Sequence, residues 1–355
     1  MLATLSVAAF AEQPTWSWSS WCKFDDSIFP SYCISTATLR VEKPPDTWKG
    51  DANGVLGVKF VPVEKNTRVT VEISASKFIR KSEVRVTLAT PGIRYTICPT
   101  LDYDFDALYA VREPEPITVS YKITDPKGVL LGQTKKRIMV RPINDCFTGI
   151  RGEPPQKEFY AAYVNENHPL VEKILQQALK ENLVPSFSGY QKGPEGVRLQ
   201  VAAIWKVLQG KGIKYSSITT ESVQNSKIRS QHVRFFDDSV ENTQANCVDG
   251  SVLMASILRK IGLKPFLVII PGHCFLGVYE DKAKAARFGI ETTAIGSGAT
   301  IEKAIQIGTE KLEKAKAKYD VTSGYYLVDI DDARKLGIQP LRSRKNSQGS
   351  SMLSH

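Results

Sequence analysis

The spacing of apolar residues changes partway along this chain of 355 residues, and that change constrains the fold more than any other feature. Up to about residue 147, apolar and polar residues alternate in short segments, as they do in half-buried strands. From about residue 156, apolar residues also recur at helical spacing. The chain is therefore expected to be an α+β protein, with strands first and a mixture of helices and strands afterwards.

The first half shows strand periodicity in several separate segments. Apolar and polar residues alternate over Arg68–Ala75, Glu83–Ala89 and Ile117–Thr124, and the last of these runs into the turn sequence Asp125-Pro126-Lys127-Gly128. Short strands at this spacing predict an antiparallel β-sandwich of immunoglobulin-like type over residues 35–147. The segment contains no set of catalytic residues, so we expect this domain to be a binding module or a spacer.

The second half is expected to form one domain over residues 156–340, after a linker at Arg151–Pro155. Apolar stripes predict helices at Pro169–Asn182 and Pro194–Gln209. The elements expected to follow are a helix at Cys247–Ile261, strands at Lys264–Ile270, His273–Tyr279 and Arg287–Thr293, a helix at Thr300–Lys318 and a strand at Tyr325–Ile330. The short, Ser-rich segment 341–355 is expected to be disordered.

Three residues with complementary chemistry stand at the ends of these expected elements. Cys247 opens a helix behind the N-cap residue Asn246, where the unpaired N–H groups and the helix dipole favour a thiolate. His273 opens a strand after a Pro-Gly turn, and Glu291 ends the apolar run of the next strand. Together they are a thiol nucleophile, its base and a carboxylate that orients the base.

Each of the three also has an ordinary structural explanation, as a core thiol, an exposed histidine and a strand-end acid. Their order along the chain favours the catalytic interpretation, and His273 is the best placed of the four histidines. Cys274 is expected to face the core, because neighbouring residues of a strand point to opposite sides. The spacing required for a zinc site is absent, so no metal is expected.

The order of cysteine at a helix start, histidine at a strand start and acid at the end of the next strand resembles the transglutaminase-like superfamily, a papain-like fold. The resemblance covers about residues 190–295, with Glu291 in place of the commoner Asp and Phe275 in place of a common Trp. It implies that Cys247, His273 and Glu291 act as nucleophile, base and orienter in peptidase-, amidase- or transferase-type chemistry through a thioester. The implied mechanism requires no metal or organic cofactor. The candidate oxyanion donors are the backbone N–H of Cys247, which is preferred, and the side chain of Gln244.

The first eleven residues and four of the cysteines suggest export. Residues 1–11 resemble the late part of a signal peptide, with Ala9-Phe10-Ala11 as a cleavage site. Four cysteines allow three pairings, of which we expect Cys22–Cys33 and Cys98–Cys146. Disulfides imply a secreted or periplasmic protein, whereas buried thiols in a cytosolic protein are the alternative.

The net charge of +10 arises partly from a Lys series on the last expected helix, beginning at Lys311, and from a basic tail. We interpret both as solvated, and no nucleic-acid motif accompanies them, so we expect no nucleic-acid partner. No apolar run is long enough to span a membrane. The expected partner is a protein or peptide substrate, and the oligomeric state is left open. The competing interpretation is an inactive scaffold of the same fold that acts as an extracellular binding or adhesion protein.

Overall fold

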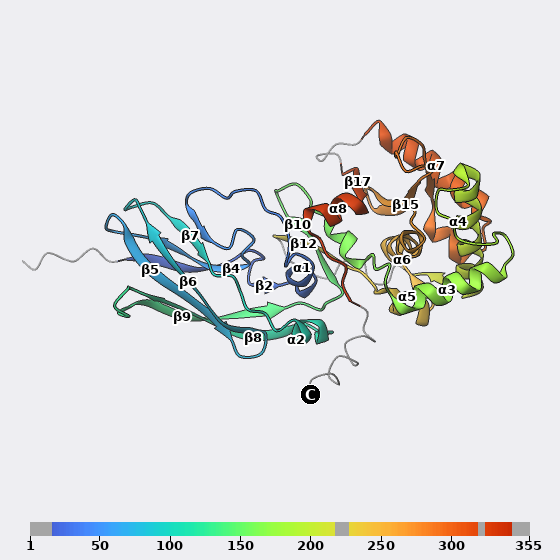
Figure 1. Cartoon of the computed structure of the whole chain (residues 1–355). Helices are drawn as coiled ribbons and strands as arrows, with labels where there is room; N and C mark the ends of the chain where they lie inside the picture. Colours follow the sequence, from blue (N-terminus) through green and yellow to red (C-terminus); the bar gives the residue numbers. More distant parts are fainter. Residues whose placement is uncertain (1–15, 217–226, 319–323, 343–355) are drawn as a thin grey trace, which may run out of the picture. The chain divides into compact units, whose positions relative to one another are not determined.

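The computed structural model describes residues 16–216, 227–318 and 324–342 (Figure 1). Helices and strands are mixed along the chain, which confirms the α+β prediction at that level. The described chain divides into two compact units. Unit 1 is built from residues 16–26, 41–104 and 116–138, and unit 2 is built from residues 27–40, 105–115 and 139–342.

Unit 1 consists of two sheets whose inner faces are buried. One sheet has the strand order β1-β4-β7-β3, and the other contains β9-β8-β5-β6. Val69, Val71 and Ile73 alternate with more exposed residues along β5, as the sequence pattern predicts. The strands are β1 (Ser17–Cys22), β3 (Trp48–Gly50), β4 (Leu56–Val61), β5 (Thr67–Ala75), β6 (Ile79–Leu88), β7 (Tyr95–Cys98), β8 (Glu115–Thr124) and β9 (Leu130–Val140).

Unit 2 surrounds a four-stranded sheet of order β16-β15-β14-β17. The elements before the candidate nucleophile are β2 (Ser27–Ile28), α1 (Pro30–Ser35), α2 (Phe105–Ala110), β10 (Asp145–Ile150), η1 (Lys157–Tyr163), α3 (Pro169–Lys180), α4 (Gly193–Gly210), β11 (Lys214–Tyr215), β12 (Ile228–His232), α5 (Phe236–Glu241) and β13 (Gln244–Ala245). The elements after it are α6 (Cys247–Lys260), β14 (Pro265–Ile270), β15 (His273–Tyr279), β16 (Arg287–Ile290), η2 (Thr292–Ser297), α7 (Ile301–Lys316), β17 (Tyr326–Asp329) and α8 (Ile330–Leu336). The helices and strands expected from residue 169 onward all form, with ends displaced by a few residues.

Two helices pack against the central sheet. Helix α6 is buried from Val248 to Leu258 and packs against β14 and β15. Helix α7 places Leu312 and Ala315 in a core cluster with Phe266, Val268, Phe275 and Tyr279. Because residues alternate along a strand, His273 shares the face of Phe275, which α7 covers.

Unit 2 is discontinuous in sequence, which differs from the predicted division at residues 35–147 and 156–340. The Ser35 carbonyl accepts a hydrogen bond from Gln339 N at 2.8 Å, and Arg40 N donates to the Leu336 carbonyl at 2.8 Å. The segment predicted as a linker also belongs to this unit, since Arg151 N donates to the Lys227 carbonyl. Periodicity identifies strands and helices, but it does not show which of them share a core.

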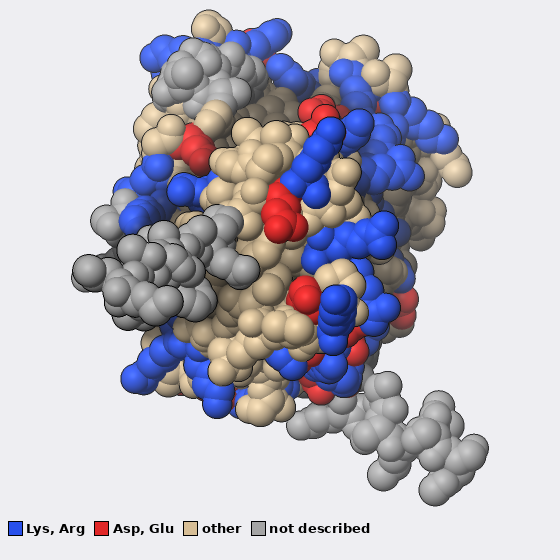
Figure 2. Space-filling view, turned by 90° about the vertical axis from the view of Figure 1, so that its left-hand side faces the viewer, with Lys and Arg blue, Asp and Glu red and all other residues tan. Residues whose placement is uncertain are grey.

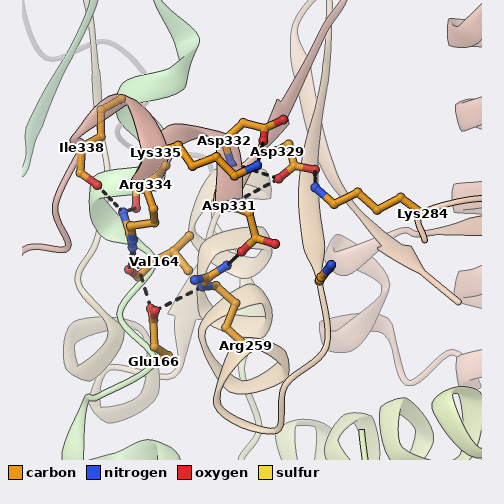
Figure 3. Close-up of polar contacts among 12 residues, drawn as sticks. Val164, Glu166, Arg259, Lys284, Asp329, Asp331, Asp332, Arg334, Lys335 and Ile338 are labelled. Carbon is orange, nitrogen blue, oxygen red and sulfur yellow. Dashed lines mark hydrogen bonds and ion pairs between the residues drawn. The ribbon is translucent and has the colours of Figure 1, made fainter. Parts of the chain in front are cut away.

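Helix α8 is held by a cluster of ion pairs that Figure 3 shows. Arg259 of α6 lies 2.6 Å from Asp331 and 3.2 Å from Glu166. Arg334 donates to the backbone carbonyls of Val164 and Ile338. Burial lowers the pKa of Arg334 to about 10, although Glu166 opposes this shift. The cluster fixes α8 against α6, and Leu341, expected at the start of the tail, is buried.

The expected disulfides are not formed, because all six cysteines are thiols. Cys98 belongs to unit 1, where its sulfur lies against the backbone of Gly54 and Gly57, whereas Cys146 is buried in unit 2. Cys22 and Cys33 are likewise divided between the two units. Each thiol is therefore packed within its own unit instead of joining its expected partner.

The expected signal segment 1–11 and residues 343–355 of the expected tail lie outside the described residues. Within the described ranges, no helix has the length and apolar character needed to cross a bilayer. Lys and Arg side chains outnumber Asp and Glu on the face shown in Figure 2, in keeping with the net charge of +10.

Candidate active site

Cys247 is the first residue of α6, and a capping box fixes the start of that helix. Asn246 Oδ1 accepts hydrogen bonds from the N–H groups of Val248 and Asp249, both at 2.9 Å. Asp249 Oδ2 in turn accepts from Asn246 N at 2.9 Å and from Arg234 at 2.8 Å. These bonds satisfy the N–H groups of the first turn and hold the half-buried Cys247 thiol in place.

His273 stands at the mouth of β15 because the hairpin between β14 and β15 is tight. Ile270 and His273 are paired in the ladder, so Pro271 and Gly272 alone form the turn. Gly272 has a φ of 73°, which a glycine adopts without strain. The hairpin thereby directs the imidazole to the end of the sheet, beside Cys247, which is close enough to raise the pKa of His273.

Glu291 follows β16 and is buried, with 4 % of its surface exposed. Its Oε2 atom lies 2.8 Å from His273 Nε2, and its Oε1 atom accepts from Thr293 Oγ1 at 2.6 Å. The backbone N–H of Glu291 donates to the Ala304 carbonyl of α7 at 3.0 Å. The carboxylate is thus fixed by the strand, the turn and the helix together.

Lys311 of α7 completes this group, which corrects the expectation that the Lys series is a solvated face. Lys311 Nζ lies 2.5 Å from Glu291 Oε2 and 3.4 Å from His273 Nε2. Burial disfavours the charged form of Glu291, but hydrogen bonds from His273, Lys311 and Thr293 outweigh it and lower the pKa of Glu291 to about 2. The carboxylate is ionised over the whole neutral range.

The ionised carboxylate defines the roles of the two imidazole nitrogens. Since Glu291 can only accept, Nε2–H of His273 is the donor in their contact, and Nδ1 is the nitrogen left for Cys247. The hydrogen bonds of His273 with Cys247 and with Glu291 outweigh burial and raise the pKa of His273 to about 9. His273 is therefore protonated at neutral pH and carries the proton beside the Cys247 sulfur.

Helix α7 reaches this site because two glycines allow its backbone to touch β16. A Cβ atom on Gly289 would lie 2.3 Å from the Gly308 carbonyl oxygen, and a Cβ atom on Gly308 would lie 2.4 Å from Ile290 N. Neither position has room for a side chain. The close approach places Lys311, one turn beyond Gly308, next to Glu291.

Cys247 and His273 open onto a cleft of about 520 Å³ in unit 2. One wall is formed by the hairpin between β14 and β15, and another by η1 and β12. A cleft of this size is sufficient for part of a peptide or another small acyl donor.

The structure thus brings Cys247, His273 and Glu291 together, as the sequence pattern predicts, but not Gln244. Gln244 is exposed on β13, and it does not line the cleft. Cys274 is buried, with 1 % of its surface exposed, and burial raises the pKa of its thiol. It forms a hydrogen bond with Ser251 on the inner side of α6.

Tyr215 is a site residue that the sequence pattern did not reveal. It lies on β11, which pairs in parallel with β13 immediately before Cys247, and it lines the cleft. Burial raises the pKa of Tyr215, and Cys247 and Glu291 add to the shift, which places the phenol close to the site. A short polar segment gives no periodicity that would have identified it.

The described residues contain no group of three His, Cys, Asp or Glu side chains arranged to hold a metal ion. The sequence matches no protein-family model and no curated protein. The proposed function therefore rests on the geometry and chemistry of the site.

Proposed function

We propose that this chain is a cysteine-dependent acyl-transfer enzyme, in which Cys247 is the nucleophile, His273 the base and acid, and Glu291 the orienting carboxylate. The observation that carries the proposal is that Cys247 lies beside His273 on one cleft, while His273 Nε2 lies 2.8 Å from the Glu291 carboxylate. The three side chains stand in the order thiol, imidazole and carboxylate, which is the order of a nucleophile, its base and the group that orients the base. Cys247 and His273 also line a cleft.

In the first half-reaction, the Cys247 proton resides on His273 Nδ1, and the thiolate attacks the carbonyl carbon of an amide. A C–S bond forms while the carbonyl electron pair moves to oxygen. When the pair returns, the C–N bond breaks and the leaving nitrogen takes the proton from His273 Nδ1. The products are a thioester on Cys247, a free amine and a neutral His273.

In the second half-reaction, water or an amine attacks the thioester carbon and gives its proton to His273. Collapse of the tetrahedral intermediate expels the Cys247 thiolate and restores the thiolate–imidazolium pair. Glu291 stabilises the imidazolium whenever it is present, that is, before the first half-reaction and during the second. Lys311 fixes the carboxylate without exchanging a proton with the substrate.

The developing oxyanion has two candidate donors beside the nucleophile. The Val248 and Asp249 N–H groups are already bonded to Asn246, whereas Cys247 N–H has no acceptor among the described residues. The Tyr215 hydroxyl is the second candidate, since it lines the same cleft. Both are placed before chemistry begins, as effective stabilisation of an oxyanion requires.

We also propose a specific fold for each of the two units. The helix-borne cysteine, the strand-borne histidine and the acid after the next strand support a transglutaminase-like fold for unit 2. The two sheets of unit 1 support an immunoglobulin-like sandwich, which we propose binds or spaces.

The proposal is tested by thiol reactivity. The folded protein is treated with iodoacetamide at mildly acidic pH, and the modified cysteine is identified by peptide mapping, with the unfolded protein as the reference. Cys247 is expected to react faster than in the unfolded chain, and His273→Gln should abolish the difference. Equal rates in folded and unfolded protein would rule out an activated thiol and favour the inactive binding scaffold.

A further inference from the structure

The cleft that contains Cys247 and His273 is positively charged. Arg151, Lys157 and Arg229 line it, and none of the described residues that line it is Asp or Glu. Lys157 lies on η1 and Arg229 on β12, so the charge belongs to one wall of the cleft. The proposed reaction uses neither residue.

Lys157 is a half-buried cation without a carboxylate partner among the described residues. Its Nζ atom lies 5.4 Å from the centre of the Tyr160 ring and 3.5 Å from the Tyr160 hydroxyl. Burial lowers the pKa of Lys157, and the nearby Arg229 lowers it further. A cation in this position is incompletely stabilised until an anion approaches.

Arg229 is oriented in the same wall by backbone groups. It donates to the carbonyls of Ile150 at 3.4 Å and of Glu153 at 3.0 Å, and no carboxylate in ranges 16–216, 227–318 and 324–342 forms an ion pair with it. Gln231, two residues along the same strand, shares its face and accepts a hydrogen bond from the Tyr160 hydroxyl at 2.8 Å. Lys157, Tyr160, Gln231 and Arg229 therefore form one connected polar wall.

Several half-buried cations elsewhere in unit 2 have a carboxylate partner, unlike this pair. Arg234 pairs with Asp249, and Arg259 pairs with Asp331. Lys284 pairs with Asp329 at 2.5 Å, and Figure 3 shows the last two of these pairs within one network. Lys157 and Arg229 thus stand out as cations that face a cleft and form no ion pair with a carboxylate in the described part of the chain.

We infer that this wall, formed by Lys157, Tyr160, Gln231 and Arg229, binds a carboxylate of the acyl donor while the reacting amide lies at Cys247. The inference deepens the proposed function, because it names the substrate class as an acidic peptide or another carboxylate-bearing amide. Two cations contribute attraction to any carboxylate, and the side-chain NH2 group of Gln231, whose Oε1 atom is oriented by the Tyr160 hydroxyl, adds a directional donor. Neutral and cationic donors are disfavoured at the same wall.

The test compares two alkylating agents of nearly equal size that differ in charge. Iodoacetate carries a carboxylate and iodoacetamide does not, and both modify Cys247 without requiring turnover. At mildly acidic pH, where Lys157 holds its proton, the ratio of the iodoacetate rate to the iodoacetamide rate is measured at Cys247. The reference is the same ratio for the unfolded protein.

The variants are Lys157→Gln and Arg229→Gln, with Lys157→Arg to retain the charge and Lys303→Gln as a control on the exposed face of α7. The ratio should exceed that of the unfolded protein by about tenfold and should fall about threefold to tenfold in either Gln variant. Lys157→Arg and Lys303→Gln should retain most of the increase in the ratio of the iodoacetate rate to the iodoacetamide rate. His273 attracts iodoacetate equally in all of these proteins, so the difference between variants isolates the wall.

A second experiment distinguishes two carboxylates that a peptide donor can offer, namely a Glu side chain and a free C-terminus. Peptides with an internal Glu and an amidated C-terminus, the same peptides with Gln, and Gln peptides with a free C-terminus are compared as protectants of Cys247 against iodoacetamide. Protection by either carboxylate-bearing peptide, lost in Lys157→Gln, supports the inference and identifies the source.

A ratio equal to that of the unfolded protein, or one unchanged in both Gln variants, would overturn the inference. Failure of the proposed function has a different signature, namely a slow iodoacetamide reaction at Cys247 in every variant. The two failures are therefore distinguished within one experiment.

Discussion

Lys311 Nζ lies 2.5 Å from Glu291 Oε2, the same oxygen atom that receives the hydrogen bond from His273 Nε2. One carboxylate oxygen thus joins a permanent cation on α7 to the titrating imidazole on β15. The arrangement keeps Glu291 ionised and orients it, so that its charge is available to the imidazolium that forms beside Cys247.

Replacement of Lys311 by Met removes one of the hydrogen bonds that hold the pKa of Glu291 near 2. The pKa of Glu291 should rise. The stability that its depressed pKa contributes is present above its ordinary pKa of 4.5 and is lost as pH falls toward 2. The variant should therefore be less stable than the wild type by about 0.5–1 kcal/mol at neutral pH, with the difference narrowing below pH 4.5.

Urea unfolding of both proteins at several pH values measures this difference, and Lys314→Met, an exposed change on the same helix, is the matched control. A difference that stays constant from neutral to acidic pH would show that Lys311 acts by packing alone.

Glu291→Gln keeps the shape of the side chain and removes its charge. The amide no longer stabilises the imidazolium and can present N–H to Nε2, which disturbs the orientation and protonation of the ring. We expect kcat to fall by about 10²- to 10⁴-fold and the pKa of His273 to fall below about 9. The comparison is with Glu302→Gln, an exposed acid in the first turn of α7, and equal activity of the two variants would contradict the assigned role.

Cys247→Ala removes the largest cause of the raised His273 pKa, which should then fall from about 9 toward 6.5. A raised pKa stabilises the folded state fully below 6.5 and loses that contribution as pH rises through 9. The unfolding free energy of Cys247→Ala should therefore change less than that of the wild type between these pH values.

NMR titration of the His273 ring signals tests the pKa directly, and the His232 signals in the same spectra serve as an internal control. An unchanged His273 titration in Cys247→Ala would mean that the thiol does not interact with the ring.

Gly289→Ala should separate α7 from β16, because the new methyl group would meet the Gly308 carbonyl at 2.3 Å. We expect a loss of about 1–3 kcal/mol in unfolding free energy. Since Lys311 reaches Glu291 only through this close approach, the activity of the remaining folded protein should also fall. Gly210→Ala is the control, because a methyl group at that position would have nothing within 4 Å, and it should be neutral or slightly stabilising.

Tyr215→Phe tests the second oxyanion donor. If the hydroxyl stabilises the tetrahedral intermediate, kcat should fall by about 10- to 10³-fold with little change in KM. The unfolding free energy is expected to stay the same, since Tyr215 is 51 % exposed. A normal kcat would leave the backbone N–H of Cys247 as the donor.

The sequence was most informative where function depends on order along the chain. Cys247, His273 and Glu291 lie at element ends that apolar periodicity and turn residues define, so their convergence was predictable. Lys311 was not, because helical spacing places it in a Lys series, and only the contact between Gly289 and Gly308 turns it toward Glu291. Lys157 and Arg229 lie in short segments without periodicity, so nothing in the sequence placed them in one cleft.

The sequence was least informative about which distant segments pack together in one core. The thiols of Cys98 and Cys146 were expected to pair, but each is buried in a different unit. Strand alternation reports that one side of a segment is buried, and it does not identify the core that buries it. For the same reason, the sequence did not show that residues 27–40 belong to unit 2.

The pieces of unit 1 and unit 2 alternate along the chain, so the two units are not interchangeable modules. A fragment of residues 156–340, chosen from the sequence pattern, would lack Ser35, Arg40 and β10, which hydrogen-bond or pair with its own segments. Exchange of unit 2 between proteins therefore requires that the pieces of unit 1 that separate its segments be carried along or replaced by short connections. Recombination at a single crossover near residue 150 would produce two incomplete folds, and this architecture favours inheritance of the whole chain.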